Sequence, residues 1–256
     1  MKLIFILLLG VGVLSANPAL SQSIDDIEWI TEDYQPFSYI GKMNMPAGLS
    51  IEIVQALWKE VGLKKSASDI KFHPWARGYQ MVQQQKRICL FAMSVTEQRM
   101  ARFQFVGFWK GSNIAIIAKR SRGLKIDSIA DLDNLNIGVV REDIGEKLLT
   151  ETGTKPFLYP VTTGDQLIRM LALDRLDAIA FGDIPAAWTM KVIGIDPSQF
   201  ELVFVLKQGS SGLAFNKEAD AAVVRKFQDA FDTLNKEGVI DTIRNKYLIL
   251  DTASWH

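Results

Sequence analysis

The sequence has little of the chemistry on which metal clusters, disulfide frameworks and nucleic-acid binding depend. Its 256 residues include one cysteine, Cys89, and two histidines, His73 and His256. A single cysteine cannot form an intrachain disulfide, and so few Cys and His side chains cannot build a zinc cluster. Basic and acidic side chains number 29 each, so no excess positive charge attracts nucleic acid. We therefore expect no metal, no cofactor and no nucleic-acid partner.

Long apolar runs are also scarce, and the longest lies near the N-terminus at residues 3–14. This run follows a single lysine and is too short to span a bilayer comfortably, which is typical of the apolar core of a signal peptide. Ala19 and Ser21 then supply the small residues that signal peptidase requires. We predict a cleaved signal peptide over residues 1–21 and hence a periplasmic location. Ala16 offers a competing cleavage position, and an uncleaved anchor is the alternative.

Short β-rich runs alternate with amphipathic segments along the rest of the chain. Helices are predicted at 50–61, from the capping box that begins at Thr163, at 222–234, and after Gly238. Strands alternating with helices predict an α/β architecture. The predicted strands, which are rich in Ile, Val or Phe and bounded by polar residues, are 27–31, 70–75, 88–94, 113–119, 136–140, 157–161, 178–181, 202–206 and 212–216.

No internal repeat or long polar linker divides the chain, so any two domains must be joined by crossing strands. Glycine and serine gather at residues 111–113 and again at residues 208–212, each time just before a predicted strand. Such residues accommodate changes in φ and ψ at low cost, which suits a hinge. We predict that the chain crosses between domains at these two places.

A series of motifs resembles, in order, the type II periplasmic solute-binding proteins, in particular the receptors of solute-binding family 3. Each motif alone is weak, but their order extends over most of the chain. The most specific is Ser/Thr-x-Thr-x-x-Arg followed by Phe-x-Phe. The matching segments are 34–38, 48–54, 94–105, 136–140, 174–178, 212–217 and 235–248.

The resemblance implies a two-lobed fold, with a mixed sheet flanked by helices in each lobe and two hinge strands between them. Lobe 1 would comprise residues 22–112 and 208–256, and lobe 2 residues 113–207. It further implies a monomeric, non-enzymatic receptor that holds a small polar ligand, amino acid-like or carboxylate-bearing, in the cleft. The partner implied is the membrane permease of an ABC-type importer, and the role is amino acid transport.

Arg99 is the first ligand-binding candidate, because the arginine of this motif holds the ligand's carboxylate in the family. A guanidinium suits that role, since its planar fork of donors matches a carboxylate and stays charged at any relevant pH. The alternative is a surface arginine that pairs with Glu97 or stacks on Phe103. Ser94 and Thr96 precede Arg99, and the resemblance places both near the ligand. Thr96 is also well placed to cap the helix that begins at Glu97.

Aromatic candidates come from two other segments. The resemblance implies that Tyr34 forms a wall against the apolar part of the ligand, and that Trp75 forms a second one. Arg77, two residues after Trp75, would supply a second cation. The alternative for Trp75 is a packed core position, and for Arg77 a solvated one.

Asp183 and Asp143 are the candidates from the second lobe. Asp183 follows a predicted strand, where the family places an aspartate that binds the ligand's amine, but it is also a candidate N-cap. The sequence departs from the family at Arg141-Glu142-Asp143, where amino acid receptors usually carry Gly and Thr. An acidic pair there repels a carboxylate, so Asp143 would cap a helix or meet a cationic ligand group.

A periplasmic enzyme on the same fold is the competing function, for example a dehydratase of cyclohexadienyl acids. That chemistry needs a positioned general acid or base. No second side chain suited to acid or base catalysis lies beside His73 in the sequence. Catalysis by carboxylates alone is the form of this alternative that is left.

Overall fold

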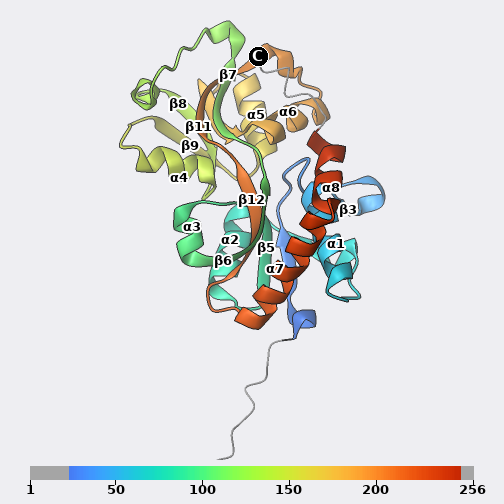
Figure 1. The fold of residues 1–256 in the computed structure, drawn as a ribbon. Helices are drawn as coiled ribbons and strands as arrows, with labels where there is room; N and C mark the ends of the chain where they lie inside the picture. Colours follow the sequence, from blue (N-terminus) through green and yellow to red (C-terminus); the bar gives the residue numbers. More distant parts are fainter. Residues whose placement is uncertain (1–22, 249–256) are drawn as a thin grey trace, which may run out of the picture.

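The computed structural model describes residues 23–248, and the predicted signal peptide lies outside them. Two separate five-stranded sheets, each flanked by helices, form two lobes, which confirms the predicted α/β class (Figure 1). Among the described residues, no helix is both long and apolar enough to cross a membrane.

The first sheet combines residues from both ends of the described chain. Strands β1, β4 and β5 are parallel, while β12 runs antiparallel between β5 and β6. A two-stranded hairpin, β2 (Tyr39–Ile40) with β3 (Pro46–Ala47), lies beside it. In spatial order the strands are β4 (Ile70–Phe72), β1 (Glu28–Thr31), β5 (Ile88–Ser94), β12 (Ser210–Asn216) and β6 (Phe103–Lys110).

Side chains of β1 point alternately to the two faces of this sheet and pack into the core on each face. Trp29 points to one face, where its ring lies edge-on to Trp58 and Phe227 at 5.3 and 5.1 Å. Ile30 points to the other face, into the cluster that contains Trp75. The helices of this lobe are α1 (Leu49–Glu60), α2 (Trp75–Gln84), α3 (Glu97–Arg102), α7 (Ala221–Lys236) and α8 (Val239–Leu248).

The second sheet is built from one continuous stretch of chain. Strands β10, β8 and β9 are parallel, and β7 runs antiparallel to both β10 and β11. Its core strands are apolar on both faces because helices cover the sheet. The spatial order is β11 (Phe200–Lys207), β7 (Ile114–Lys119), β10 (Ala178–Gly182), β8 (Asn136–Val140) and β9 (Phe157–Val161). The helices are α4 (Ile144–Glu151), α5 (Gly164–Ala172) and α6 (Asp183–Val192).

The chain passes between the sheets twice, at residues 111–113 and 208–209. The two segments lie side by side, since the Gly111 amide donates to the Gly209 carbonyl at 3.2 Å (Figure 1). A Cβ atom on Gly209 would lie 1.7 Å from the Ser112 carbonyl oxygen, so the crossing requires glycine there. The lobe boundaries predicted from the sequence, 22–112 with 208–256 and 113–207, stay a proposal.

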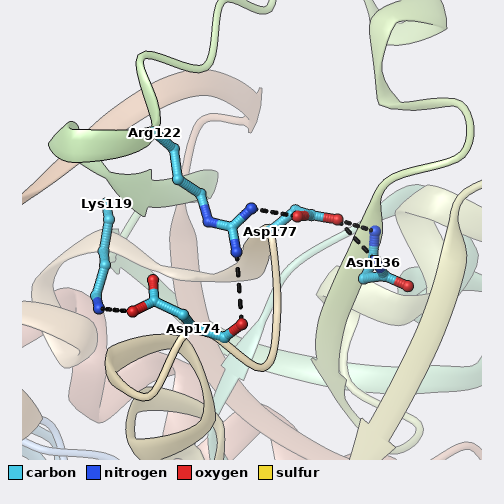
Figure 2. Close-up of polar contacts among 5 residues, drawn as sticks. All are labelled: Lys119, Arg122, Asn136, Asp174 and Asp177. Carbon is cyan, nitrogen blue, oxygen red and sulfur yellow. Dashed lines mark hydrogen bonds and ion pairs between the residues drawn. The ribbon is translucent and has the colours of Figure 1, made fainter.

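The Asp174–Asp177 turn closes the far end of the second lobe (Figure 2). Asp177 accepts hydrogen bonds from the Asn136 amide and side chain at 2.7 and 2.9 Å, and it pairs with Arg122. Lys119 pairs with Asp174 at 2.7 Å. Ile114 at the start of β7 pairs with Gly182 at the end of β10 near the hinge, and Ala118 pairs with Ala178 at the opposite end. This motif, which resembles the family's turn, therefore holds strand ends together away from the hinge.

One predicted strand needs correction, and one strand of the structure was not predicted. The predicted strand 70–75 ends at Phe72, because Pro74 cannot donate to a strand ladder and Trp75 instead begins helix α2. Strand β6 was not predicted, because its burial does not alternate and Gly107 has a positive φ of 63° within it.

Candidate functional site

Arg99 lies buried on α3 between the two lobes. Thr96 occupies the N-cap position, as the sequence predicted, and its hydroxyl accepts from the Arg99 amide at 3.1 Å. Arg99 is only 2% exposed, and its Nη1 donates to the Ser94 carbonyl at 3.0 Å. Among the described residues, its Nε and Nη2 atoms have no hydrogen-bond partner. Two buried donors are therefore available to an acceptor.

Two aromatic rings of α2 form the floor beneath Arg99. Trp75 and Tyr79 are four residues apart, which places both on one side of the helix. The Arg99 guanidinium carbon lies 4.9 Å from the Trp75 ring centroid and 5.6 Å from that of Tyr79. A guanidinium stacks favourably on such rings, so they fix its orientation.

The loop after β8 faces this group from the second lobe. The Trp75 indole nitrogen donates to the Glu142 carbonyl at 2.8 Å, and Lys147 lies 4.7 Å from the Tyr79 ring centroid. Glu142 has a φ of 61°, a conformation that glycine adopts most easily. The backbone therefore keeps a glycine-like conformation although the side chain is acidic. These contacts join the lobes on both sides of Arg99.

Two carboxyl groups, a buried one at Asp143 and a half-buried one at Glu32, interact electrostatically with Arg99. Asp143, which is 7% exposed, occupies the N-cap position of α4 without a side-chain capping hydrogen bond. Burial raises the pKa of Asp143, and the charge of Arg99 opposes that rise. Glu32 follows β1, and burial together with the charge of Asp143 raises its pKa well above the ordinary value of 4.5. The charge of the guanidinium therefore acts on both acids, and the two acids act on each other.

Tyr34 joins the first lobe to the end of β10. Its ring stacks on Phe37 at 5.7 Å and lies edge-on to Phe181 at 5.5 Å. A Cβ atom on Gly182 would lie 2.3 Å from the Tyr34 hydroxyl oxygen. Burial, followed by the charge of Asp143, raises the pKa of Tyr34, so this phenol stays protonated. Glycine at position 182 thus permits the close approach of the two lobes.

Asp183 is held by the hinge. Its carboxylate accepts from the Ser112 hydroxyl at 2.6 Å, the Asn113 side-chain amide at 2.9 Å and the Ile184 amide at 2.7 Å. Asn113 in turn accepts from the Gly209 amide at 3.3 Å, so one network includes both crossing segments. Gly182, not Asp183, occupies the N-cap position of α6. The geometry gives Asp183 a structural role, and its ligand-binding role stays a prediction.

The structure gathers three of the eight predicted ligand-binding residues, together with two that were not predicted, into one group, which we call the Arg99 cluster. Its members are Arg99, Trp75, Tyr79, Asp143 and Glu32. Of the other predicted residues, Ser94 and Thr96 adjoin it, and Tyr34 lies between it and the hinge. Arg77 is exposed on α2, where its charge acts on His73. All eight predicted ligand-binding roles stay predictions.

The sequence analysis missed Glu32, Tyr79 and Lys147. A signal for Glu32 was present, because it follows the first strand and ligands of open α/β sheets bind at the carboxyl ends of strands. The helical spacing of Trp75 and Tyr79 was a second signal. Nothing in the sequence pattern pointed to Lys147.

A cavity of about 640 Å³ opens beside Arg99 between α3 and α4, and it reaches Thr96, Glu142 and Lys147. A second cavity of about 310 Å³ lies on the Tyr34 side, against Phe181 and the start of α5. Both lie where the two lobes meet. Within residues 23–248, no group of three or more His, Cys, Asp or Glu side chains is arranged to hold a metal ion.

The fold is that of the two-lobed type II periplasmic binding proteins, as the comparisons with solved structures show. A histidine kinase sensor domain similar to periplasmic binding proteins superposes with a TM-score of 0.74 at 21% identity, covering 87% of this chain and 96% of that one. The substrate-binding protein of an amino acid ABC transporter gives 0.73 at 19% identity, covering 87% and 98%. An ancestral amino acid-binding protein, a precursor of cyclohexadienyl dehydratase, gives 0.70 at 22% identity, covering 86% and 94%.

The sequence defines the relationship more closely than the fold does. Residues 28–249 match the bacterial extracellular solute-binding proteins, family 3, and the chain belongs to that family. This confirms the resemblance drawn from the motifs. No curated protein matches the chain. Members of the family are typically extracytoplasmic and bind small solutes.

Proposed function

We propose that the chain is a periplasmic receptor that captures a small polar ligand between its lobes and delivers it to the membrane permease of an ABC-type importer. The observation that carries the proposal is the buried Arg99 guanidinium with two unpartnered nitrogens between the lobes. A buried donor without an acceptor is costly, so a ligand acceptor at this point gains affinity. Groups of both lobes surround it, so binding there favours closure.

The test begins with native mass spectrometry of freshly purified protein, which identifies a co-purified small molecule. Isothermal titration then compares the wild type with Arg99→Ala and Arg99→Lys. We expect Arg99→Ala to weaken binding by about 2–5 kcal/mol, because it removes a desolvated, charge-assisted contact. Arg99→Lys should restore only part of the affinity, because an ammonium group lacks the planar fork.

Arg87→Ala is the matched control, since Arg87 is an exposed arginine of the same lobe that pairs with Asp26 at 3.5 Å. It should bind as the wild type does. If Arg99→Ala binds within a factor of two of the wild type, the Arg99 site is wrong, and the exposed Arg77 becomes the next cation to test.

A periplasmic enzyme is the second candidate, and one observation favours it. Glu32 is a half-buried acid whose pKa is raised by burial, which is the environment of a general acid. Assay of the purified protein with prephenate-like acids decides between the two. Turnover that Glu32→Gln abolishes would replace the receptor by an enzyme, whereas binding without turnover supports the receptor.

A further inference from the structure

Four buried tryptophans lie in the first lobe, and one of them contacts the second lobe through its indole nitrogen. Trp29, Trp58 and Trp109 bury indole nitrogens that have no hydrogen-bond partner among the described residues. Trp75, which is 3% exposed, instead donates from its indole nitrogen to the Glu142 carbonyl at 2.8 Å. Trp75 therefore makes a directed polar contact between the lobes in addition to the packing of its ring.

The acceptor of this hydrogen bond is held in place by contacts within the second lobe. Glu142 has a φ of 61°, and its amide donates to the Glu146 carboxylate at 2.5 Å. The Glu142 carboxylate pairs with Lys147 at 2.9 Å. A carbonyl in a loop that is already ordered loses little conformational freedom when Trp75 approaches it, so most of the gain from the hydrogen bond remains to hold the lobes together.

A second contact between the lobes lies one helical turn further along α2. The Lys147 ammonium nitrogen of α4 lies 4.7 Å from the ring centroid of Tyr79, which is 4% exposed. A cation over an aromatic face is attracted by the ring electrostatically. Trp75 and Tyr79 are four residues apart, so one side of α2 contacts the second lobe at two points.

The rings of Trp75 and Tyr79 also hold Arg99. The guanidinium carbon lies 4.9 Å from the Trp75 ring centroid and 5.6 Å from that of Tyr79. Trp75 thus contacts Arg99 with its ring and Glu142 with its nitrogen. Because an indole is rigid, this one side chain sets how the guanidinium lies with respect to the loop after β8.

We propose that Trp75 is an interlobe latch, which holds the lobes together in a closed form without a ligand and positions Arg99 against the second lobe. This inference rests on the proposed receptor function, since it requires lobes that open and close about the hinge. Both interlobe contacts of α2 join protein groups, so they stabilise the closed form whether or not a ligand is bound. The apparent affinity for a ligand rises with the fraction of protein that is already competent to bind it.

Small-angle scattering of the ligand-free, full-length mature protein tests the latch. Trp75→Phe keeps an aromatic ring and removes the N–H donor. One neutral hydrogen bond changes an equilibrium constant by about two- to tenfold, so Trp75→Phe should shift the lobes toward the open form by that factor and raise the radius of gyration. Trp109→Phe is the matched control, because Trp109 is buried in the same lobe at 4% exposure and its indole nitrogen has no partner among the described residues. It should scatter as the wild type does.

Solvent exchange of the Trp75 indole proton gives a second readout, which a role in packing alone would not change. Its NMR signal is assigned by its loss in Trp75→Phe. Lys147→Met removes the contact with Tyr79, so it should raise the radius of gyration and speed the exchange of the Trp75 proton by about two- to fivefold. Lys119→Met is its control, because Lys119 is a lysine of the same lobe that pairs with Asp174 at 2.7 Å, far from α2 (Figure 2).

An unchanged radius of gyration in Trp75→Phe overturns the latch, and so does an equal rise in Trp109→Phe. Unchanged exchange in Lys147→Met overturns it as well. If Trp75→Phe does not fold, the scattering of Lys147→Met against Lys119→Met decides. A ligand that depends on Arg99, combined with wild-type scattering of Trp75→Phe, would leave the receptor function standing and remove the latch alone.

Discussion

Replacing Asp183 tests whether this aspartate serves the hinge or the ligand. Its carboxylate accepts three hydrogen bonds, from Ser112, Asn113 and Ile184, and the residue is 6% exposed. Asp183→Ala leaves all three neutral donors without that acceptor, which should lower the free energy of unfolding by about 3–5 kcal/mol, since each buried donor left unsatisfied costs about 1–3 kcal/mol. Asp183→Asn keeps one side-chain oxygen for two of the donors and loses the Asn113 contact, so we expect a loss of about 1–2 kcal/mol.

Urea unfolding of each variant measures these losses, and Asp177→Ala is the matched control. Asp177 also accepts from three donors, on Arg122 and Asn136, but at the far end of the second lobe (Figure 2). Both alanine variants should be destabilised, while only Asp183→Ala should change the radius of gyration in small-angle scattering. If Asp183→Asn keeps full stability yet loses ligand affinity, Asp183 is a ligand contact and our reading of the hinge is wrong.

The remaining predictions concern closure, pH and export. Gly182→Ala should raise the radius of gyration and weaken ligand binding by at least tenfold, because the new Cβ would lie 2.3 Å from the Tyr34 hydroxyl oxygen. Adding Tyr34→Phe to the same chain should restore part of the compactness and part of the affinity. An unchanged scattering profile for Gly182→Ala would contradict the close approach of the two lobes. The folded state holds the Glu32 proton more tightly than the unfolded state, so the wild type loses stability as pH rises above 4.5. Glu32→Gln should therefore unfold at higher urea than the wild type at pH 7.5, with the gain vanishing below pH 4.5; a gain independent of pH would point to another cause. Intact-mass analysis of periplasmic extract should find a chain that starts near Gln22, and full-length protein confined to the membrane would refute export.

The sequence predicted best those elements whose pattern is local. Strands β5, β8 and β9 have the bounds expected from their runs of Ile, Val, Phe and Leu. Glycine and serine at residues 111–113 and 208–212 were the local signal for the crossing segments, and the lobe boundaries drawn from them stay a prediction. Strand β6 was missed, since a positive φ at Gly107 interrupts its alternation. Helix α2 was missed because Pro74 follows directly on a strand-like run, so the helix start was taken as part of that strand.

The candidate site was predicted only where a motif named it. Arg99 was found from the order of motifs, and its burial follows from the capped turn that begins at Thr96. The electrostatic interaction of Glu32 with Asp143 is not local, because it depends on how the two lobes meet. Similarly, no sequence pattern shows that Asp183 is held by Ser112 and Asn113, which lie on a different strand connection.

Strand β12 lies between β5 and β6 in the first sheet, although it comes after the whole second sheet in the chain. During synthesis, β5 and β6 therefore cannot pair with β12 until roughly 100 more residues have been made, and closing so long a loop is slow. The sheet of the second lobe has no such delay in strand pairing, since all its strands come from one stretch of the chain. A chain that is exported as we propose would thus remain incomplete in its first lobe until its last strand and helices have emerged.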